Sequence, residues 1–157
     1  MSPKLIRIIL LFTFLLGLGI GIYLAFYCEQ DYFSRLKKLS EGLFSAFLSI
    51  ASILFAFETF IIFKIKEGVY DSNEYRTKYK EYIEKYGLYT NLKRFSNFLL
   101  DSTIFSFLTA IVLLDYIVTD FVYIFPICLA FIFISITSLI IAWKLMKNNL
   151  NRYFDSL

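Results

Sequence analysis

IILLFTFLLGLGIGIYLAFY, residues 8–27, contains no charged side chain and is long enough to cross a bilayer as one helix. A helix rises 1.5 Å per residue, so about 20 apolar residues span roughly 30 Å of hydrocarbon. Three similar runs follow, at about residues 42–63, 95–114 and 121–143, and the first span extends over about residues 6–27. The sequence therefore predicts an all-α fold: an integral membrane four-helix bundle forming a single membrane domain over residues 1–157.

The composition agrees with a membrane protein and argues against several chemistries. Hydrophobic residues make up 59% of the chain, against about 45–50% in soluble domains. The chain has no histidine and two cysteines, Cys28 and Cys128, so the usual His/Cys zinc or haem sites have no support and we predict no cofactor. Intramembrane hydrolysis needs a nucleophile and a base. Because neither a histidine nor a paired aspartate motif is present, we do not expect an enzyme.

Basic residues predict the orientation, because they accumulate on the cytoplasmic side of membrane proteins. With the N-terminus inside, only Arg35, Lys37 and Lys38 of the 16 basic residues face outward. This topology puts both termini and an insert at residues 65–94 in the cytoplasm. We therefore expect a multi-pass protein whose first partner is the lipid bilayer.

Two spans carry rows of small or hydroxylated residues. Gly17, Gly21 and Ala25 recur every four residues and predict a close helix contact, within the bundle or between copies. In the second span a row of hydroxylated and small side chains falls within about 80° of the helix wheel. This row either bonds helices together or lines a wet path. It consists of Ser45, Ser49, Ser52, Ala56 and Thr59. Shorter rows lie in the third and fourth spans, at Ser102, Ser106 and Thr109 and at Ser135, Ser138 and Ala142.

Glu58 and Asp101 are carboxylates inside the predicted spans, each about 9–10 Å from the inner boundary. An acid near the bilayer centre opposes insertion by roughly 2.5–3.5 kcal/mol, so it usually faces protein or water. Three interpretations remain open: an acidic ring in an oligomeric pore, proton transfer in a transporter, and a buried protonated acid that bonds two helices. Glu58 lies about 140° from Ser45 on the wheel, so one face does not hold both.

The cytoplasmic insert reads as an amphipathic helix. Asp71 and Glu74 resemble a capping box that opens it, and Gly87 is its weak point. Tyrosines recur at spacings of 4, 3, 4 and 3 from Tyr75 to Tyr89 and predict one continuous tyrosine row. Such a row beside basic residues can lie in the membrane interface, form a collar between subunits, or bind a nucleotide or oligonucleotide. The candidate regulatory residues are Lys66, Tyr75, Arg76, Lys78, Tyr79, Lys80, Tyr82, Lys85 and Tyr86.

Several of these features, taken in order, resemble RexB, the small four-span membrane proteins of lambdoid phage exclusion. The similarity covers roughly residues 40–146: a Gly-Leu entry at Gly42 into a serine-rich second span, Tyr86-Gly87 before Thr90, and an acid early in the third span. The resemblance implies an ion channel in the bacterial inner membrane that depolarises the host during infection. The insert is more tyrosine-rich than this family would predict.

Together these observations predict a homo-oligomeric effector of anti-phage defence by abortive infection that passes ions through a pore. Glu58, Asp101, Ser45, Ser49, Ser52 and Thr59 are the candidate ion pathway. The insert would gate it through a cytoplasmic protein partner or a phosphorylated ligand. The alternative is a non-conducting membrane sensor or anchor subunit that recruits a soluble defence partner.

Overall fold

The fold consists of four long helices and a short helical insert. The computed structural model describes residues 3–27, 30–119 and 122–154. In chain order its elements are α1 (Pro3–Tyr27), α2 (Gln30–Ile65), the π-helical turn η1 (Lys66–Tyr70), α3 (Asn73–Lys78), α4 (Lys80–Tyr86), α5 (Thr90–Thr119), the 3₁₀ turn η2 (Val122–Ile124) and α6 (Phe125–Phe154). The predicted all-α class is confirmed for the described residues, because none of them forms a strand.

Four helices are long and apolar enough to cross a membrane, as predicted. The apolar stretches lie at Lys4–Tyr27, Arg35–Gly68, Thr90–Thr119 and Val122–Asn148. Helices α2, α5 and α6 extend further than the predicted spans because no proline or positive-φ glycine interrupts their polar flanks. The predicted span boundaries therefore follow the apolar residues, whereas the helices continue past them with their backbone bonds intact.

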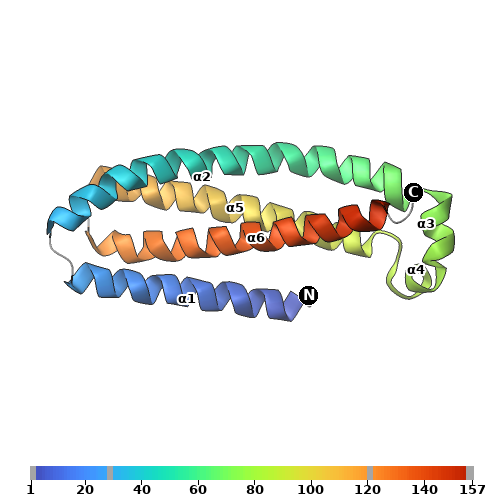
Figure 1. The fold of residues 1–157 in the computed structure, drawn as a ribbon, viewed down its shortest axis with the longest axis horizontal. Coiled ribbons are helices and arrows are strands. Elements are labelled where there is room, and N and C mark those ends of the chain that lie inside the picture. The colour runs from blue at the N-terminus through green and yellow to red at the C-terminus, as the bar shows by residue number, and fades with distance from the viewer. Residues whose placement is uncertain (1–2, 28–29, 120–121, 155–157) are drawn as a thin grey trace.

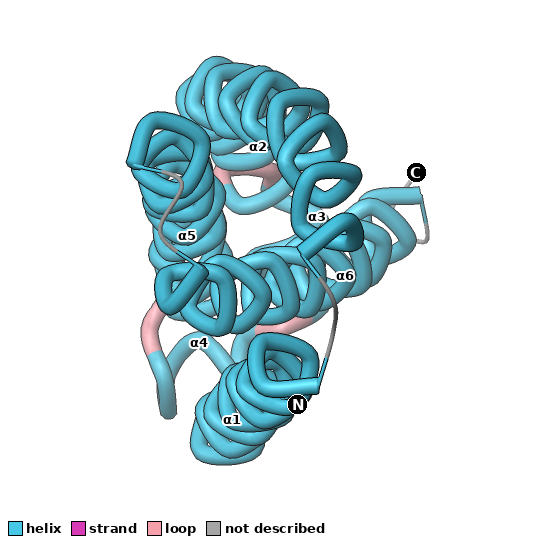
Figure 2. Tube along the Cα trace, turned by 90° about the vertical axis from the view of Figure 1, so that its left-hand side faces the viewer, coloured by secondary structure: helices cyan, strands magenta, loops and turns pink. Residues whose placement is uncertain are grey.

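The long helices pack in the order α2, α5, α6, α1, which differs from their order in the chain. Helix α2 packs along α5, α5 along α6, and α6 along α1 (Figures 1 and 2). As a result, 44% of the most apolar stretches of α5 and α6 is buried, against 17% for α1 and 12% for α2. Broad faces of α1 and α2 are thus left for lipid or for another protein.

The contact between α1 and α6 depends on two glycines. A Cβ atom at Gly21 would lie 2.4 Å from Pro126 Cα, and one at Gly17 would lie 2.8 Å from Ala130 Cα. The absence of side chains lets the two backbones approach closely, which is how helices associate in lipid. Ala25 is half-buried. The sequence left open whether this row packs within the bundle or between copies, and in the structure Gly17 and Gly21 pack against α6 of the same chain.

Two clusters of buried side chains mark the two ends of the bundle. The first, the insert-end cluster, combines Ile65, Tyr70, Tyr75, Leu92, Phe95, Phe98, Leu99, Ile141 and Ala142. The second, the loop-end cluster, combines Phe47, Ala110, Leu113, Tyr116, Phe125 and Cys128. The start of α1, the end of α6 and helices α3 and α4 all lie at the insert end (Figure 1). The insert therefore packs against the end of the bundle.

The insert, residues 66–89, is broken into short elements in place of one continuous helix. Ser72 is the N-cap of α3, and its hydroxyl accepts a bond from the Tyr75 N–H at 3.2 Å, so the cap predicted at Asp71 is one residue off. The chain leaves helical geometry at Tyr79, where φ is −113° and ψ is 24°. At Gly87 φ is +87°, a conformation that favours glycine, and α4 ends there as expected.

Candidate functional site

Helix α2 has two faces of opposite character. Phe47, Ala51 and Ile65 are buried on the side that packs on α5. Ser45, Ser49, Ser52, Ala56 and Thr59, the predicted row, are all exposed. At 100° per residue this row lies about 150° from the buried side. The serine row is therefore not used as an internal helix contact.

Hydroxyls of the exposed row are bonded within their own helix. Ser45 donates to the carbonyl of Glu41 at 3.3 Å, Ser49 to that of Ser45 at 2.8 Å, and Ser52 to that of Leu48 at 2.9 Å. A hydroxyl that donates its proton still has lone pairs that accept bonds from water or bind a cation. At these three serines the face can thus contact lipid without an unpaired donor, and it can also be wetted.

The two carboxylates of the candidate pathway lie on different surfaces. Glu58 is half-buried and falls on the buried side of α2, in line with Phe47 and Ile65. Asp101 is exposed on α5. The insert-end cluster joins Ile65 to Phe95, and the loop-end cluster joins Phe47 to Leu113. Because α2 and α5 run in opposite directions, a residue seven positions before Ile65 lies opposite a residue seven positions after Phe95. Glu58 is therefore level with Ser102, one residue from Asp101. In this register the two acids lie at about the same level of the bundle, and the structure brings neither into the serine row.

The hydroxyl rows of the third and fourth spans meet in a buried seam between α5 and α6. Ser102, Ser106, Thr109, Ser135 and Ser138 are fully buried. Thr109 Oγ1 lies 2.6 Å from Ser135 Oγ and donates to the carbonyl of Phe131 at 3.0 Å. These hydroxyls of α5 and α6 therefore form the hydrogen bonds between helices that the serine row of α2 does not form.

One hydroxyl of this seam has no partner. Ser106 Oγ is the one fully buried side-chain oxygen or nitrogen without a hydrogen bond among the described residues. An unsatisfied buried donor costs about 1–3 kcal/mol. Ser102 differs, because it donates to the Phe98 carbonyl at 2.9 Å and reaches the Ser138 carbonyl at 3.5 Å. The seam is therefore not uniformly satisfied.

The tyrosines predicted as a surface row are partly internal. Tyr75 is 3% exposed, and its ring lies 4.8 Å from both the Tyr70 and Tyr79 rings. Tyr82 donates to Asn91 Oδ1 at 2.9 Å, which ties α4 to the start of α5. The break at Tyr79 turns Tyr75 and Tyr79 toward the insert-end cluster, so the prediction of one continuous tyrosine row along a single helix is wrong. Of the candidate regulatory residues, the exposed ones are Lys66, Arg76, Lys78, Lys80, Lys85 and Tyr86.

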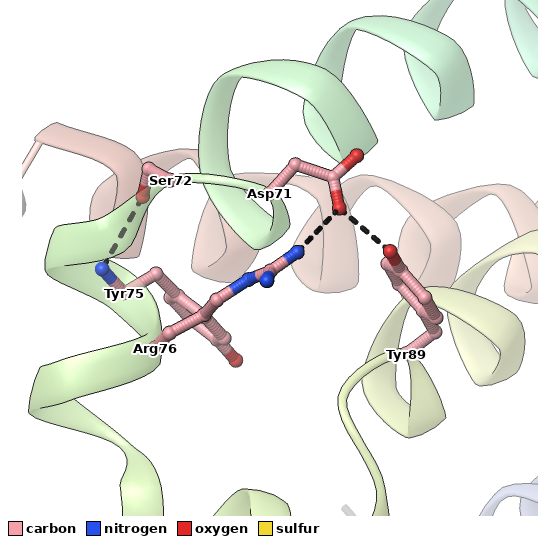
Figure 3. Close-up of polar contacts among 5 residues, drawn as sticks. All are labelled: Asp71, Ser72, Tyr75, Arg76 and Tyr89. Carbon is pink, nitrogen blue, oxygen red and sulfur yellow. Dashed lines mark hydrogen bonds and ion pairs between the residues drawn. The ribbon is translucent and has the colours of Figure 1, made fainter.

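Asp71 is the centre of the polar contacts in the insert. Its Oδ1 accepts a bond from the Tyr89 hydroxyl at 2.6 Å and one from Arg76 Nη2 at 3.5 Å (Figure 3). Lys66 Nζ lies 5.8 Å from the centre of the Tyr89 ring. We call the Asp71–Tyr89 contact the clasp, because it joins the residue after η1 to the residue before α5. Its partners are far apart in sequence, so no local pattern predicts it.

The clasp changes the proton affinity of both partners. The bond from Tyr89 and the charges of Lys66 and Arg76 lower the pKa of Asp71 below its usual 3.8, although partial burial opposes this. The same bond, with burial and the Asp71 charge, raises the pKa of Tyr89 above 10.0. At neutral pH the contact is therefore a phenol donating to a carboxylate.

The described residues were also compared with the ligand sets that bind metal ions. Among the described residues no group of three or more His, Cys, Asp or Glu side chains lies close enough to hold a metal ion. Cys128 is buried, and its thiol reaches the Val112 carbonyl at 3.5 Å. Cys28 lies outside the described residues.

Comparisons with known proteins add no identification. No protein-family model matches the chain, and no match was found to a curated protein or to a solved structure. The resemblance to RexB thus stays a prediction from the sequence.

Proposed function

We propose that this protein is a homo-oligomeric membrane effector that passes ions along a path lined by the outward face of α2. The observation that carries the proposal is the exposure of Ser45, Ser49, Ser52 and Thr59 on the side of α2 that faces away from α5. The row from residue 45 to residue 59 covers about 21 Å of the roughly 30 Å hydrocarbon thickness. Small side chains leave room at a shared axis, and hydroxyls replace part of the water shell of a passing ion.

A single copy does not provide this path. Its α5–α6 seam is filled by buried hydroxyls, which except for Ser106 are bonded to each other or to backbone, and its two clusters are filled mostly by aromatic and aliphatic side chains. Several copies with their α2 faces turned inward would enclose the path between them. In this arrangement Glu58 lies behind the lining, against α5, and Asp101 faces outward from α5. Neither acid then forms the ring that the sequence suggests.

Control of the path is assigned to the insert. Helix α2 continues directly into η1, and the clasp fixes the residue after η1 to the start of α5. A ligand or partner that separates Asp71 from Tyr89 would release the end of α2. The biological role that fits, membrane depolarisation in anti-phage defence at a bacterial inner membrane, is implied by the resemblance to RexB.

The test combines ion flux with cysteine accessibility in vesicles that contain the purified full chain. The background carries Cys28→Ser and Cys128→Ala. We expect Ser49→Cys and Ser52→Cys to react with a charged thiosulfonate, because the reactive thiolate forms in water. Ile53→Cys is the matched control, since Ile53 is 54% exposed but lies about 80° around the same helix from the centre of the serine row.

Flux that is blocked by labelling Ser49→Cys and unaffected in Ile53→Cys would support the pore. Equal labelling of the two positions, with no flux under any trigger, would exclude it. The defence role is tested separately in cells, by following the membrane potential with a voltage-sensitive dye during phage infection and by counting phage plaques. If the protein conducts ions in vesicles but does not change phage plating, the conduction proposal is supported and the defence role is refuted.

The second candidate is a membrane anchor that recruits a soluble partner. One observation favours it: α4 has no buried residue, and Lys80, Glu81, Glu84, Lys85 and Tyr86 are all exposed. In that case Lys85→Ala with Tyr86→Ala should abolish binding of the partner. Tyr123→Ala, which removes a 70% exposed ring near the other end of the bundle, should leave binding intact.

A further inference from the structure

Basic side chains surround the bundle at one level, the level of the insert-end cluster. This cluster takes neighbouring residues from all four long helices: Ile6 of α1, Ile65 of α2, Phe95 of α5 and Leu145 of α6. Each is directly adjacent in sequence to an exposed base, respectively Arg7, Lys64, Arg94 and Lys144. Because consecutive helical residues point about 100° apart, the apolar member enters the core and the basic member faces outward. We call these four bases the basic belt.

Among the described residues, the opposite end of the bundle has no such arrangement. At the loop-end cluster the exposed bases, Arg35 and Lys38, come from α2 alone, and α5 presents the acid Asp115. At the insert end the exposed acids, Glu67, Glu74, Glu81 and Glu84, all belong to the insert and are outnumbered by the bases there, and Asp71 is already held by Tyr89 and Arg76. The positive field is thus concentrated at one level of one end.

Trp143 places a membrane interface at the same level. It follows Ala142 of the insert-end cluster, precedes Lys144, and is 65% exposed. Tryptophan favours the headgroup region, and a base next to it reaches the phosphates. Of the insert tyrosines, Tyr70 and Tyr75 are buried in the core and do not serve this role, whereas Tyr86 and Tyr89 are exposed.

We infer that the basic belt binds the headgroups of anionic phospholipids, and that this contact holds the insert end of the bundle at an anionic leaflet. The ligand is a phosphodiester on a diacyl lipid, recognised by charge beside an exposed apolar helix face. The inference does not depend on ion conduction. Each base near an anionic surface contributes about a fivefold preference over a zwitterionic lipid, and the preference weakens with salt.

Trp143 is the only tryptophan in the chain, so its fluorescence reports on this surface without a label. The purified protein is reconstituted in phosphatidylcholine, and brominated phosphatidylglycerol or brominated phosphatidylcholine replaces part of the lipid. We expect the brominated phosphatidylglycerol to quench Trp143 with a relative binding constant at least about fivefold higher, the contribution of one adjacent base, and this preference should fall toward one at high salt. Soluble glycerol phosphate at equal concentration should not compete.

Two variants localise the effect. Lys144→Gln with Lys147→Gln removes the exposed bases next to Trp143 and should bring the relative binding constant close to one. Arg35→Gln with Lys38→Gln removes the same charge from the other end and should leave it unchanged. Equal quenching by both lipids in the wild type, or an equal loss in both variants, would overturn the inference. Competition by glycerol phosphate would show a free-anion site and would overturn the lipid assignment.

Discussion

Gly21→Ala tests the contact between α1 and α6, where an added Cβ would meet the partner helix at a shorter distance than at Gly17. The new methyl group would lie 2.4 Å from Pro126 Cα and 3.2 Å from the Pro126 carbonyl oxygen. Ordinary carbon contacts begin near 3.4 Å, so the two helices must separate by about 1 Å at this point. Neither neighbouring atom belongs to a flexible side chain, so the strain is not relieved by a rotamer change.

The expected cost follows from two opposing effects. Overpacking a filled contact destabilises by about 1–3 kcal/mol, and the better helix propensity of alanine offsets about 1 kcal/mol of this. We therefore expect Gly21→Ala to lower the free energy of unfolding by up to about 2 kcal/mol. Gly17→Ala meets Ala130 Cα at 2.8 Å and should lose less.

Gly19→Ala is the matched control, because its Cβ would have nothing within 4 Å. It gains helix propensity without a clash, so its stability should be unchanged or higher by up to about 1 kcal/mol. The assay is reversible unfolding of the purified protein in mixed micelles by sodium dodecyl sulfate, followed by circular dichroism. Equal stability of Gly21→Ala and Gly19→Ala would refute the α1–α6 packing described here.

Three further predictions concern hydrogen bonds. Thr109→Val and Ser135→Ala should each destabilise the α5–α6 seam, and a double-mutant cycle in the same micelle assay should give a coupling of about 0.6 kcal/mol, with no coupling if the 2.6 Å contact is absent. Ser106→Ala should be neutral or stabilising, because it removes an unpaired buried hydroxyl, and a clear loss would mean that the hydroxyl has a partner. Tyr89→Phe should raise the pKa of Asp71 back toward 3.8, measured by carboxyl NMR. The difference in free energy of unfolding between wild type and Tyr89→Phe should be largest between pH 3.8 and 10.0. It should shrink as the pH falls through the lowered pKa of Asp71 and as the pH rises through the raised pKa of Tyr89. A difference that does not depend on pH would contradict the clasp.

Much of this protein follows from the sequence alone. Hydrophobic runs identified the four long helices because the length of an apolar run directly sets whether a helix can cross a bilayer. Gly87 marked the end of α4, because a positive φ strongly favours glycine. The spacing of Gly17 and Gly21 indicated a close contact, since only small residues let backbones approach.

Which surfaces meet was decided by the tertiary structure. Lipid-facing and protein-facing sides of a membrane helix are similarly apolar, so periodicity does not separate them. The serine rows of α2 and α5 look alike in sequence, but Ser49 is exposed and Ser106 is buried. The clasp is equally invisible to local patterns, because Asp71 and Tyr89 meet only after η1, α3 and α4 fold the insert back on itself. The sequence of a membrane bundle thus determines its helices, whereas the pairing of their faces depends on steric fit and interhelical bonds that form only in three dimensions.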